Sequence, residues 1–225
     1  DDVVMIALDS QATVINLNNT STPFQVAQGS IVSDVDGERQ ATMLFSQGTT
    51  ATMTLPDGTQ QVLNQITVRA TEYTVGENGP QSMPGPLPPT SGYTYAVELG
   101  ADEAIAAGAT QITFNQAVPV YVDNFLNFPV GEIVPVGYYD LNQSSWIASP
   151  NGRVIKILGI NSNFADLDVD GDAIADTGTK LTELGITDAE RSQLASLYTV
   201  GKSLWRFQVN HFTPWDCNWP YGPPG

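Results

Sequence analysis

The sequence predicts a mainly β protein, an antiparallel β-sandwich with a calcium-type acidic loop and one or two short helices before its last strand. Short apolar or alternating runs recur at intervals of roughly 8 to 12 residues, as in sandwiches and barrels. Clusters of Gly, Pro, Asn and Asp separate these runs and are typical of turns. Only 14% of the residues are charged, and the abundance of Gly, Thr, Asn, Gln and Pro suits an exported β-rich chain.

The apolar and alternating runs place the expected strands along the whole chain. A Gly- and Pro-rich stretch at 76–92 interrupts them and should form a long surface loop, because proline cannot donate to a sheet ladder. Helical segments are expected at 101–107 and 180–198, and Thr187 and Glu190 have the spacing of a capping box. The expected strands are 3–8, 11–17, 30–35, 41–45, 51–55, 62–70, 93–99, 111–114, 118–122, 130–139, 145–148, 153–158 and 203–212.

The length of 225 residues is sufficient for one domain with a large core. We expect residues 1–213 to form a β-sandwich module, divisible into sub-sheets over 1–120 and 121–213. Residues 214–225 should form an aromatic, Pro-rich tail. The Asn151-Gly152 pair should make a hairpin turn into the strand that follows it.

Charge and cysteine content exclude several classes of protein. Eight basic against 24 acidic residues give a net charge of −16, which repels nucleic acid and anionic lipid. No stretch of about eighteen apolar residues is present, so membrane insertion is not expected. The lone Cys217 cannot form an internal disulfide and should be an inert thiol. Because Asp1-Asp2 opens the sequence without a signal peptide, we expect a piece of a longer secreted or cell-surface protein.

An acidic loop precedes the second helical segment. Asp168, Asp170, Asp172 and Asp176 occupy positions 1, 3, 5 and 9 of this loop, and Ile174 can supply a backbone carbonyl at position 7. Calcium takes six to eight oxygen ligands, and alternate residues of a tight loop can direct them to one point. The spacing therefore predicts a structural calcium site made by these five residues.

Two departures from the usual calcium loop leave an alternative open. Ala173 stands at position 6, where glycine is usual, and Thr179 stands at position 12 in place of a bidentate glutamate. Asp166, Glu183 or water would then complete the site. The alternative is a solvated acidic turn that holds no ion.

The stretch Asn210-His211-Phe212-Thr213-Pro214 contains the only histidine of the chain. A hydroxyl residue directly after a peptide bond can attack the preceding carbonyl and form an ester by an N-to-O acyl shift, which water then resolves. Thr213 would attack the Phe212 carbonyl, and His211 would accept the proton and later give it to the departing amine. Pro214 holds Thr213 in extended conformations, which can add strain to the bond. The plainer alternative is that His211 ends the last strand with its ring partly buried and hydrogen-bonded.

This stretch resembles the His-Phe-Ser autoproteolysis site of ZU-five domains, as in ankyrin, netrin-receptor and PIDD-like proteins. The resemblance implies a ZU-five-like sandwich in which Thr213 attacks the Phe212 carbonyl with help from His211. Threonine replaces the usual serine, and Pro214 follows it. Further stretches that resemble ZU-five strands are 51–59, 112–118, with Ala117 where proline is usual, and 134–140 with Trp146.

Three other stretches resemble a module found upstream of RHS/YD repeats in large bacterial secreted or surface proteins. They are 71–75, 89–95 and 211–220, and the likeness covers most of 28–221. It implies a processing and presentation domain, whose partners are the neighbouring domains of its own parent chain, including RHS/YD repeats. None of those repeats lies in this sequence, and the sequence does not identify an external partner.

These observations lead to one leading function and two alternatives. The first is an autoproteolytic domain that cuts its own Phe212-Thr213 bond once, with the two pieces remaining associated and no external substrate. The second is a non-catalytic, calcium-stabilised structural or adhesion sandwich in an RHS-repeat surface protein. The third is carbohydrate binding, and it is weaker because aromatic residues in a tail are more often packing anchors. Its residues would be Trp205, Trp215, Trp219 and Tyr221.

Overall fold

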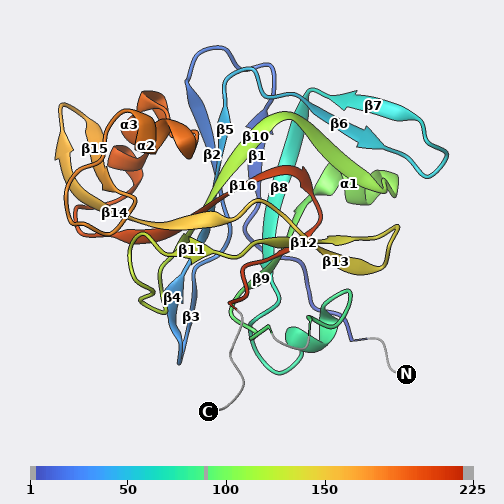
Figure 1. The fold of residues 1–225 in the computed structure, drawn as a ribbon. Helices are drawn as coiled ribbons and strands as arrows, with labels where there is room; N and C mark the ends of the chain where they lie inside the picture. Colours follow the sequence, from blue (N-terminus) through green and yellow to red (C-terminus); the bar gives the residue numbers. More distant parts are fainter. Residues whose placement is uncertain (1–3, 89–90, 220–225) are drawn as a thin grey trace.

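The structure, a computed structural model, describes residues 4–88 and 91–219. It confirms the predicted class: the chain is mainly β, its sheets are antiparallel and its helices are few and short (Figure 1). Among the described residues, no helix has both the length and the apolar character needed to cross a membrane.

One sheet has six strands within the described residues. Its strand order is β1-β8-β9-β17-β12-β13, and the paired strands are antiparallel. The strands are β1 (Thr13–Asn16), β8 (Gln65–Glu72), β9 (Ala96–Ala101), β17 (Pro214–Asp216), β12 (Gly137–Asp140) and β13 (Ser145–Ala148).

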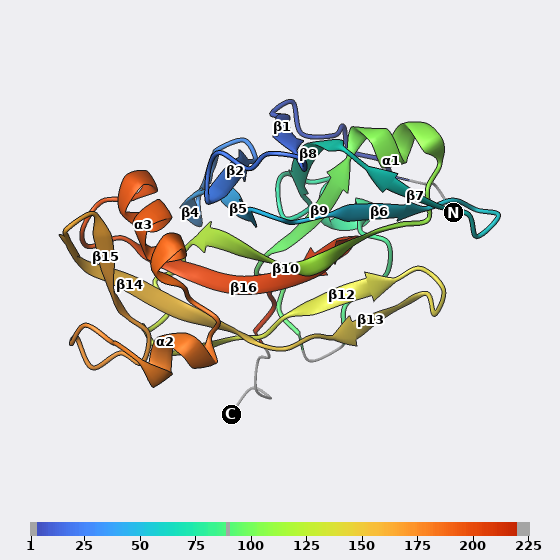
Figure 2. The same ribbon diagram turned by 90° about the horizontal axis from the view of Figure 1, so that it is seen from above.

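The other large sheet has nine strands in the same part of the chain. Its main path is β11-β14-β16-β10-β5-β2, with β15 paired to β14 and β6 paired to β10 and β7. Figure 2 shows β10 and β16 side by side through the middle of the molecule. The strands are β2 (Phe24–Gln28), β5 (Ala41–Ser46), β6 (Ala51–Thr54), β7 (Gln60–Leu63), β10 (Gln111–Asp123), β11 (Ile133–Val134), β14 (Gly152–Asn161), β15 (Phe164–Asp168) and β16 (Ser203–Phe212).

The main core lies between the two sheets. Both sheets contribute to one cluster of buried apolar side chains, as expected for a sandwich. In β8 and in much of β16, alternation places every second residue in this core. Representative members are Ile66, Val68 and Leu99 from the six-stranded sheet and Phe45, Trp205 and Phe207 from the nine-stranded sheet.

Two helices, α2 (Thr179–Glu183) and α3 (Asp188–Leu197), cover the outer face of the nine-stranded sheet at the β14–β15 end (Figures 1 and 2). The helix α1 (Asp102–Ala107) lies elsewhere, beside β8 and β9. A second apolar cluster, which includes Leu44, Ile155 and Leu194, fills the space beneath α2 and α3.

A buried ion pair joins α3 to β16 beneath the helices. Arg206 donates its Nε–H to Glu190 Oε1 at 2.8 Å, and both side chains are almost fully buried. The hydroxyl of Tyr121 on β10 bonds the same carboxylate, and Arg206 Nη1 donates to the Leu184 carbonyl at the end of α2. Because Arg206 binds the Glu190 side chain, only half of the predicted capping box of Thr187 and Glu190 forms. Thr187 accepts from the Glu190 backbone N–H, whereas the Glu190 side chain turns to Arg206.

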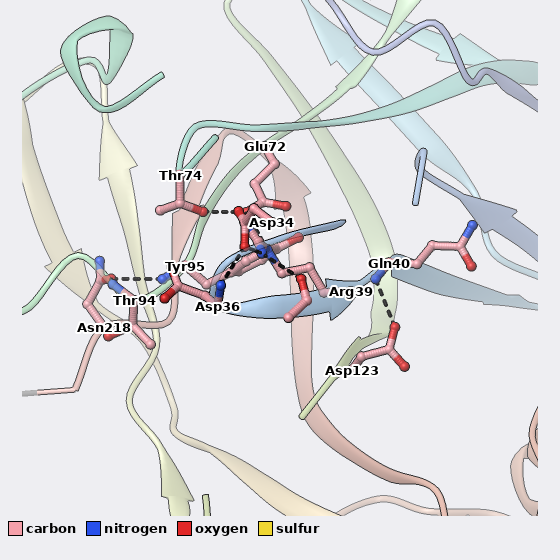
Figure 3. A network of polar contacts seen from close by, with 11 residues as sticks. Asp34, Asp36, Arg39, Gln40, Glu72, Thr74, Thr94, Tyr95, Asp123 and Asn218 are labelled. Carbon is pink, nitrogen blue, oxygen red and sulfur yellow. Dashed lines mark hydrogen bonds and ion pairs between the residues drawn. The ribbon is translucent and has the colours of Figure 1, made fainter. Parts of the chain in front are cut away.

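A small hairpin of β3 (Val32–Asp34) and β4 (Gly37–Arg39) is fixed to the sandwich by another buried ion pair (Figure 3). Arg39, 2% exposed, bonds the Asp34 carboxylate through two nitrogens and donates to Glu72 Oε1 at 2.7 Å. Its guanidinium also lies over the Phe125 ring. Burial raises the pKa of Glu72, while Arg39 and Thr74 oppose the rise.

Several local predictions differ from the structure. The Asn151-Gly152 pair does not close a hairpin, because β13 and β14 belong to different sheets. The predicted helix at 180–198 is broken between α2 and α3, where Gly185 has a positive φ. Residues 4–8, the described part of the run at 3–8, form no strand. The two strands predicted at 111–114 and 118–122 are one strand, β10, with a register shift between its halves.

Residue 120, the expected boundary between the two sub-sheets, lies within β10. Each large sheet contains strands from both sides of this position. Residues 214–216, expected at the start of a tail, form β17 inside the six-stranded sheet. The chain thus passes from one layer of the sandwich to the other at Thr213.

Candidate functional site

The Phe212-Thr213 bond lies where the chain changes sheets. Phe212 ends β16, which pairs with β10 in the nine-stranded sheet, and Pro214 begins β17, which lies between β9 and β12 in the six-stranded sheet (Figure 1). Between them, the Thr213 carbonyl accepts a hydrogen bond from the Leu99 N–H at 3.3 Å. Strand pairing on both sides therefore fixes the position of this bond.

The Phe212 ring anchors the N-terminal side of the bond. It is 6% exposed and packs edge-on against Phe114, with centroids 4.8 Å apart, and against Phe45 at 6.3 Å. Edge-to-face pairs of this kind add to the stability that comes from burial alone. Phe212 pairs with Ile112 of β10, so its backbone is held as firmly as its ring.

The hydroxyl and the imidazole predicted to react do lie together. Thr213 Oγ1 is 3.4 Å from His211 Nδ1, and Oγ1 is also 3.3 Å from the Pro214 carbonyl. When Nδ1 is the unprotonated ring nitrogen, it can accept the hydroxyl proton. A separation this long is common before a reaction begins and shortens in the reacting complex.

Backbone strain at this bond is not seen in the form of a positive φ. In the described residues, the non-glycine positions with positive φ are Asn127, Ser144, Ser162, Asn163 and Ala173. Neither Phe212 nor Thr213 is among them.

The His211 ring is enclosed by two aromatic side chains. Trp215 stacks on it with centroids 4.9 Å apart and planes at 28°, and Tyr138 meets it edge-on at 4.7 Å. His211 is 9% exposed. This burial lowers the pKa of the imidazole below its ordinary value, and the nearby negative charge of Asp140 partly offsets the effect. The neutral ring, which is the form that accepts a proton, is therefore favoured at neutral pH.

Two surface hollows meet at Thr213. One, of about 240 Å³, is lined by His211, Tyr138 and Asp140, and the other, of about 140 Å³, by Leu99, Phe212 and Pro214. Thr213 lines both. Phe212 and Thr213 thus both line a surface hollow.

The acidic loop forms a second group of charged side chains, between β15 and α2. One carboxylate oxygen from each of Asp168, Asp170 and Asp176 lies within 4.8 Å of the others, so these three residues could hold a metal ion. Asp168 and Asp176 are buried, which is unusual for carboxylates without compensating partners.

Backbone amides shape this loop around Asp168. Its Oδ1 accepts from the Gly171 N–H at 2.7 Å, and its Oδ2 accepts from the Ala173 N–H at 3.0 Å. Ala173 has a φ of +61°, so it adopts the left-handed conformation for which glycine is usual at position 6. The loop has the predicted turn despite the alanine.

The other predicted ligands are placed less closely. Asp172 accepts from the Ile174 N–H, and the Ile174 side chain is 67% exposed. Asp166 pairs instead with Arg191, at 3.3 Å, and with Asn161. Glu183 lies on α2 beside the hollow next to Arg206. The clustered carboxylates are thus a subset of the predicted set.

Lys180 neutralises part of the loop from the first turn of α2. Its ammonium bonds Asp170 and lies 2.6 Å from Asp176 Oδ1 and 3.8 Å from Asp172 Oδ2. The hydrogen bond from Lys180 lowers the pKa of Asp170. A divalent cation in this position would have to share the carboxylates with this lysine or displace it.

Of the residues proposed for carbohydrate binding, Trp205 and Trp215 lie in the core and Trp219 packs against it. Trp205 and Trp215 are at most 1% exposed, and Trp219 stacks on Phe128 at 4.1 Å. Tyr221 lies outside the described residues. Cys217 is fully buried, and burial raises the pKa of its thiol well above the ordinary value, as expected of an inert cysteine.

The structure adds Tyr138 and Asp140 to the site, which sequence reasoning did not select. Both come from β12, whose pairing with β17 brings Tyr138 opposite Trp215. The run Tyr138-Tyr139-Asp140 is a weak signal by itself, because nothing local shows that this strand lies beside the His211 stretch.

Comparisons with family models, curated proteins and solved structures gave no match for this chain.

Proposed function

We propose that this protein is an autoproteolytic processing domain that cleaves its own Phe212-Thr213 bond. The observation that carries the proposal is the 3.4 Å approach of Thr213 Oγ1 to His211 Nδ1 at the point where the chain changes sheets. The resemblance of Asn210-His211-Phe212-Thr213 to the ZU-five cleavage site also supports it.

In the first step, Thr213 Oγ1 attacks the Phe212 carbonyl carbon while His211 Nδ1 takes the hydroxyl proton. The bond from that carbon to the Thr213 nitrogen then breaks, and the imidazolium gives its proton to the nitrogen. The product is an ester between the Phe212 carboxyl and Oγ1, and a free Thr213 α-amine. Because both groups belong to one chain, their effective concentration is high.

In the second step, water attacks the ester carbonyl. The ester bond breaks, Phe212 keeps a carboxylate and Thr213 regains its hydroxyl. The neutral imidazole of His211, favoured by burial, can accept the proton of the attacking water. Each chain is cut once, and no external substrate takes part.

The two pieces would remain associated after cleavage. β17 is hydrogen-bonded on both sides, to β9 and to β12, and Trp215 and Cys217 are buried in the main core. Asn218 Oδ1 also accepts from the Thr94 and Tyr95 N–H groups (Figure 3). These contacts all join the C-terminal piece to residues on the N-terminal side of the cut.

Denaturing electrophoresis beside size-exclusion chromatography tests this proposal. Purified wild-type protein should give a band for residues 1–212 under denaturing conditions, with residues 213–225 released as a small peptide. It should give one peak containing both pieces under native conditions, while Thr213→Ala should give only the full-length band. A single full-length wild-type band after incubation of folded protein at neutral pH contradicts the proposal.

A second candidate function is a calcium-stabilised structural or adhesion module without catalysis. The clustering of Asp168, Asp170 and Asp176 favours it, since hard oxygen ligands in a tight loop suit calcium. The two functions are compatible, because an ion here would order the loop that leads into α2. In either case we infer a place in a large secreted or cell-surface bacterial protein, next to RHS/YD repeats, from the sequence resemblance.

A further inference from the structure

We propose that Trp215 and Tyr138 are positioning residues for self-cleavage, forming an aromatic clamp that holds the His211 imidazole against the Thr213 hydroxyl. The inference rests on the proposed function and adds the residues that orient its base.

Trp215 contacts His211 in two ways. Its indole stacks on the imidazole at 4.9 Å, and its Nε1–H donates to the His211 carbonyl at 3.3 Å. The stack restricts the plane of the imidazole, and the hydrogen bond restricts the backbone that carries it. Together they limit the positions that Nδ1 can take relative to Thr213 Oγ1.

Tyr138 packs against the imidazole next to Trp215, so the three rings contact one another. Its ring meets the imidazole edge-on at 73° and also contacts Trp215, with centroids 5.5 Å apart. The imidazole therefore cannot rotate toward β12 without displacing a ring. Tyr138 lies opposite Trp215 in the β12–β17 pairing, so one strand pair supplies both rings.

The clamp is rigid because two strand pairings and the packing of the main core fix the position of Trp215. It is 1% exposed, it pairs with Val97 of β9 as well as with Tyr138 of β12, and it belongs to the main core. A base held by such a side chain stays near its reacting geometry, and misplacement by about 1 Å can cost on the order of 100-fold in rate.

The clamp also removes water from the imidazole. The titratable groups of β12 and β17 near the imidazole are Tyr138, Tyr139, Asp140 and Asp216. On β9, Glu98 lies opposite Pro214, and its carboxylate accepts from the Tyr73 hydroxyl. The β10 residue opposite His211 is the uncharged Thr113. Asp140 affects the imidazole by its charge, whereas Asp216 accepts from Asn218. Opening the clamp should therefore raise the pKa of His211 toward its ordinary value, because the ring regains water.

The first experiment titrates the His211 ring by NMR in the non-cleaving Thr213→Ala protein. The chain has one histidine, so its ring signals need no assignment. Adding Trp215→Leu or Tyr138→Leu should raise the titration midpoint. Trp215→Phe is the matched control, since it keeps an aromatic ring against the imidazole while losing the indole N–H and part of the ring area, and its midpoint should stay close to that of the parent.

The second experiment measures first-order cleavage against pH in proteins that retain Thr213. Trp215→Leu should lower the plateau rate by roughly 10- to 100-fold and move the midpoint of the profile to higher pH. Tyr138→Leu should do the same to a smaller extent, and it provides the test if Trp215→Leu does not fold.

The outcomes separate three cases. An unchanged ring midpoint and an unchanged plateau rate in the folded leucine variants overturn the clamp. A loss of folded protein with both quantities unchanged in the folded fraction assigns the rings a structural role only, and also overturns it. If the wild type never cleaves, the proposed function fails, while the ring titration still decides whether these residues hold the imidazole.

Discussion

The indole of Trp215 and the imidazole of His211 stack with centroids 4.9 Å apart, on opposite sides of the peptide bond between Phe212 and Thr213. The His211 imidazole therefore lies on the N-terminal side of this bond, and the indole that stacks on it lies on the C-terminal side. Cleavage would cut the chain between them, while pairing of β17 with β9 and β12 keeps the Trp215 indole in place. The geometry explains how such a site can react once and leave the fold intact.

The pH dependence of cleavage should follow the His211 ring. Cleavage should be fast where the imidazole is neutral and should slow as the pH falls through its pKa, which burial lowers. Asp140 raises that pKa, so Asp140→Asn should move the midpoint of the rate profile to lower pH. Asp57→Asn is the control, because Asp57 is a turn carboxylate that likewise accepts a backbone N–H, from Thr59, and does not contribute to the pKa shift of His211. Equal profiles for Asp140→Asn and wild type contradict the assignment of His211 as the base.

Replacement of the nucleophile by serine should increase the rate. Thr213→Ser keeps the hydroxyl and removes a methyl group, so Oγ can approach the Phe212 carbonyl with less hindrance. We expect a several-fold faster first-order rate in a time course of intact masses. A Thr213→Ser protein that remains full-length while the wild type is cut would contradict attack by this hydroxyl.

The ion pair between Glu190 and Arg206 should be important for stability. Glu190→Ala leaves a buried guanidinium without its carboxylate and should cost about 3–5 kcal/mol of unfolding free energy. Asp188→Asn is the control, since it removes an exposed partner of Arg191 and should cost less than about 1 kcal/mol. Urea unfolding in the Thr213→Ala background measures both. Similar losses for the two variants would show that burial of this pair has little energetic effect.

Calcium should raise the melting temperature if the acidic loop binds it. An ion that binds only the folded state, present at a free concentration of ten times its dissociation constant, raises the free energy of unfolding by about 1.4 kcal/mol. Asp176→Asn keeps an acceptor for the Val169 N–H but removes a charge, so it should abolish the response. No shift at millimolar calcium, or an equal shift with sodium chloride at matched ionic strength, removes the calcium site.

Local patterns in the sequence predict some elements well. The strand at 203–212 coincides with β16, because Trp205, Phe207 and Val209 alternate with polar residues over a long run. The Thr187 cap is also confirmed, since capping depends on residues within one turn. The clustering of Asp168, Asp170 and Asp176 is predictable for the same reason, because these residues are close in sequence.

Long-range pairing accounts for what the sequence did not predict. Tyr138 reaches His211 only because β12 pairs with β17, and no local pattern encodes that register. Phe212 departs from the alternation of β16 and packs in the same core as Val209, where the β10 register shifts. Glu190 was expected to complete a cap, but Arg206 and Tyr121 bind its carboxylate instead.

Intact mass spectrometry of the folded, purified protein tests the central claim most directly. Self-cleavage predicts two species, one ending at Phe212 and one beginning at Thr213, whose masses sum to that of the full chain plus one water. His211→Ala should slow their appearance by about 100-fold or more, and Thr213→Ala should abolish it. A wild-type sample that stays at the full-length mass under native conditions at neutral pH would contradict the claim.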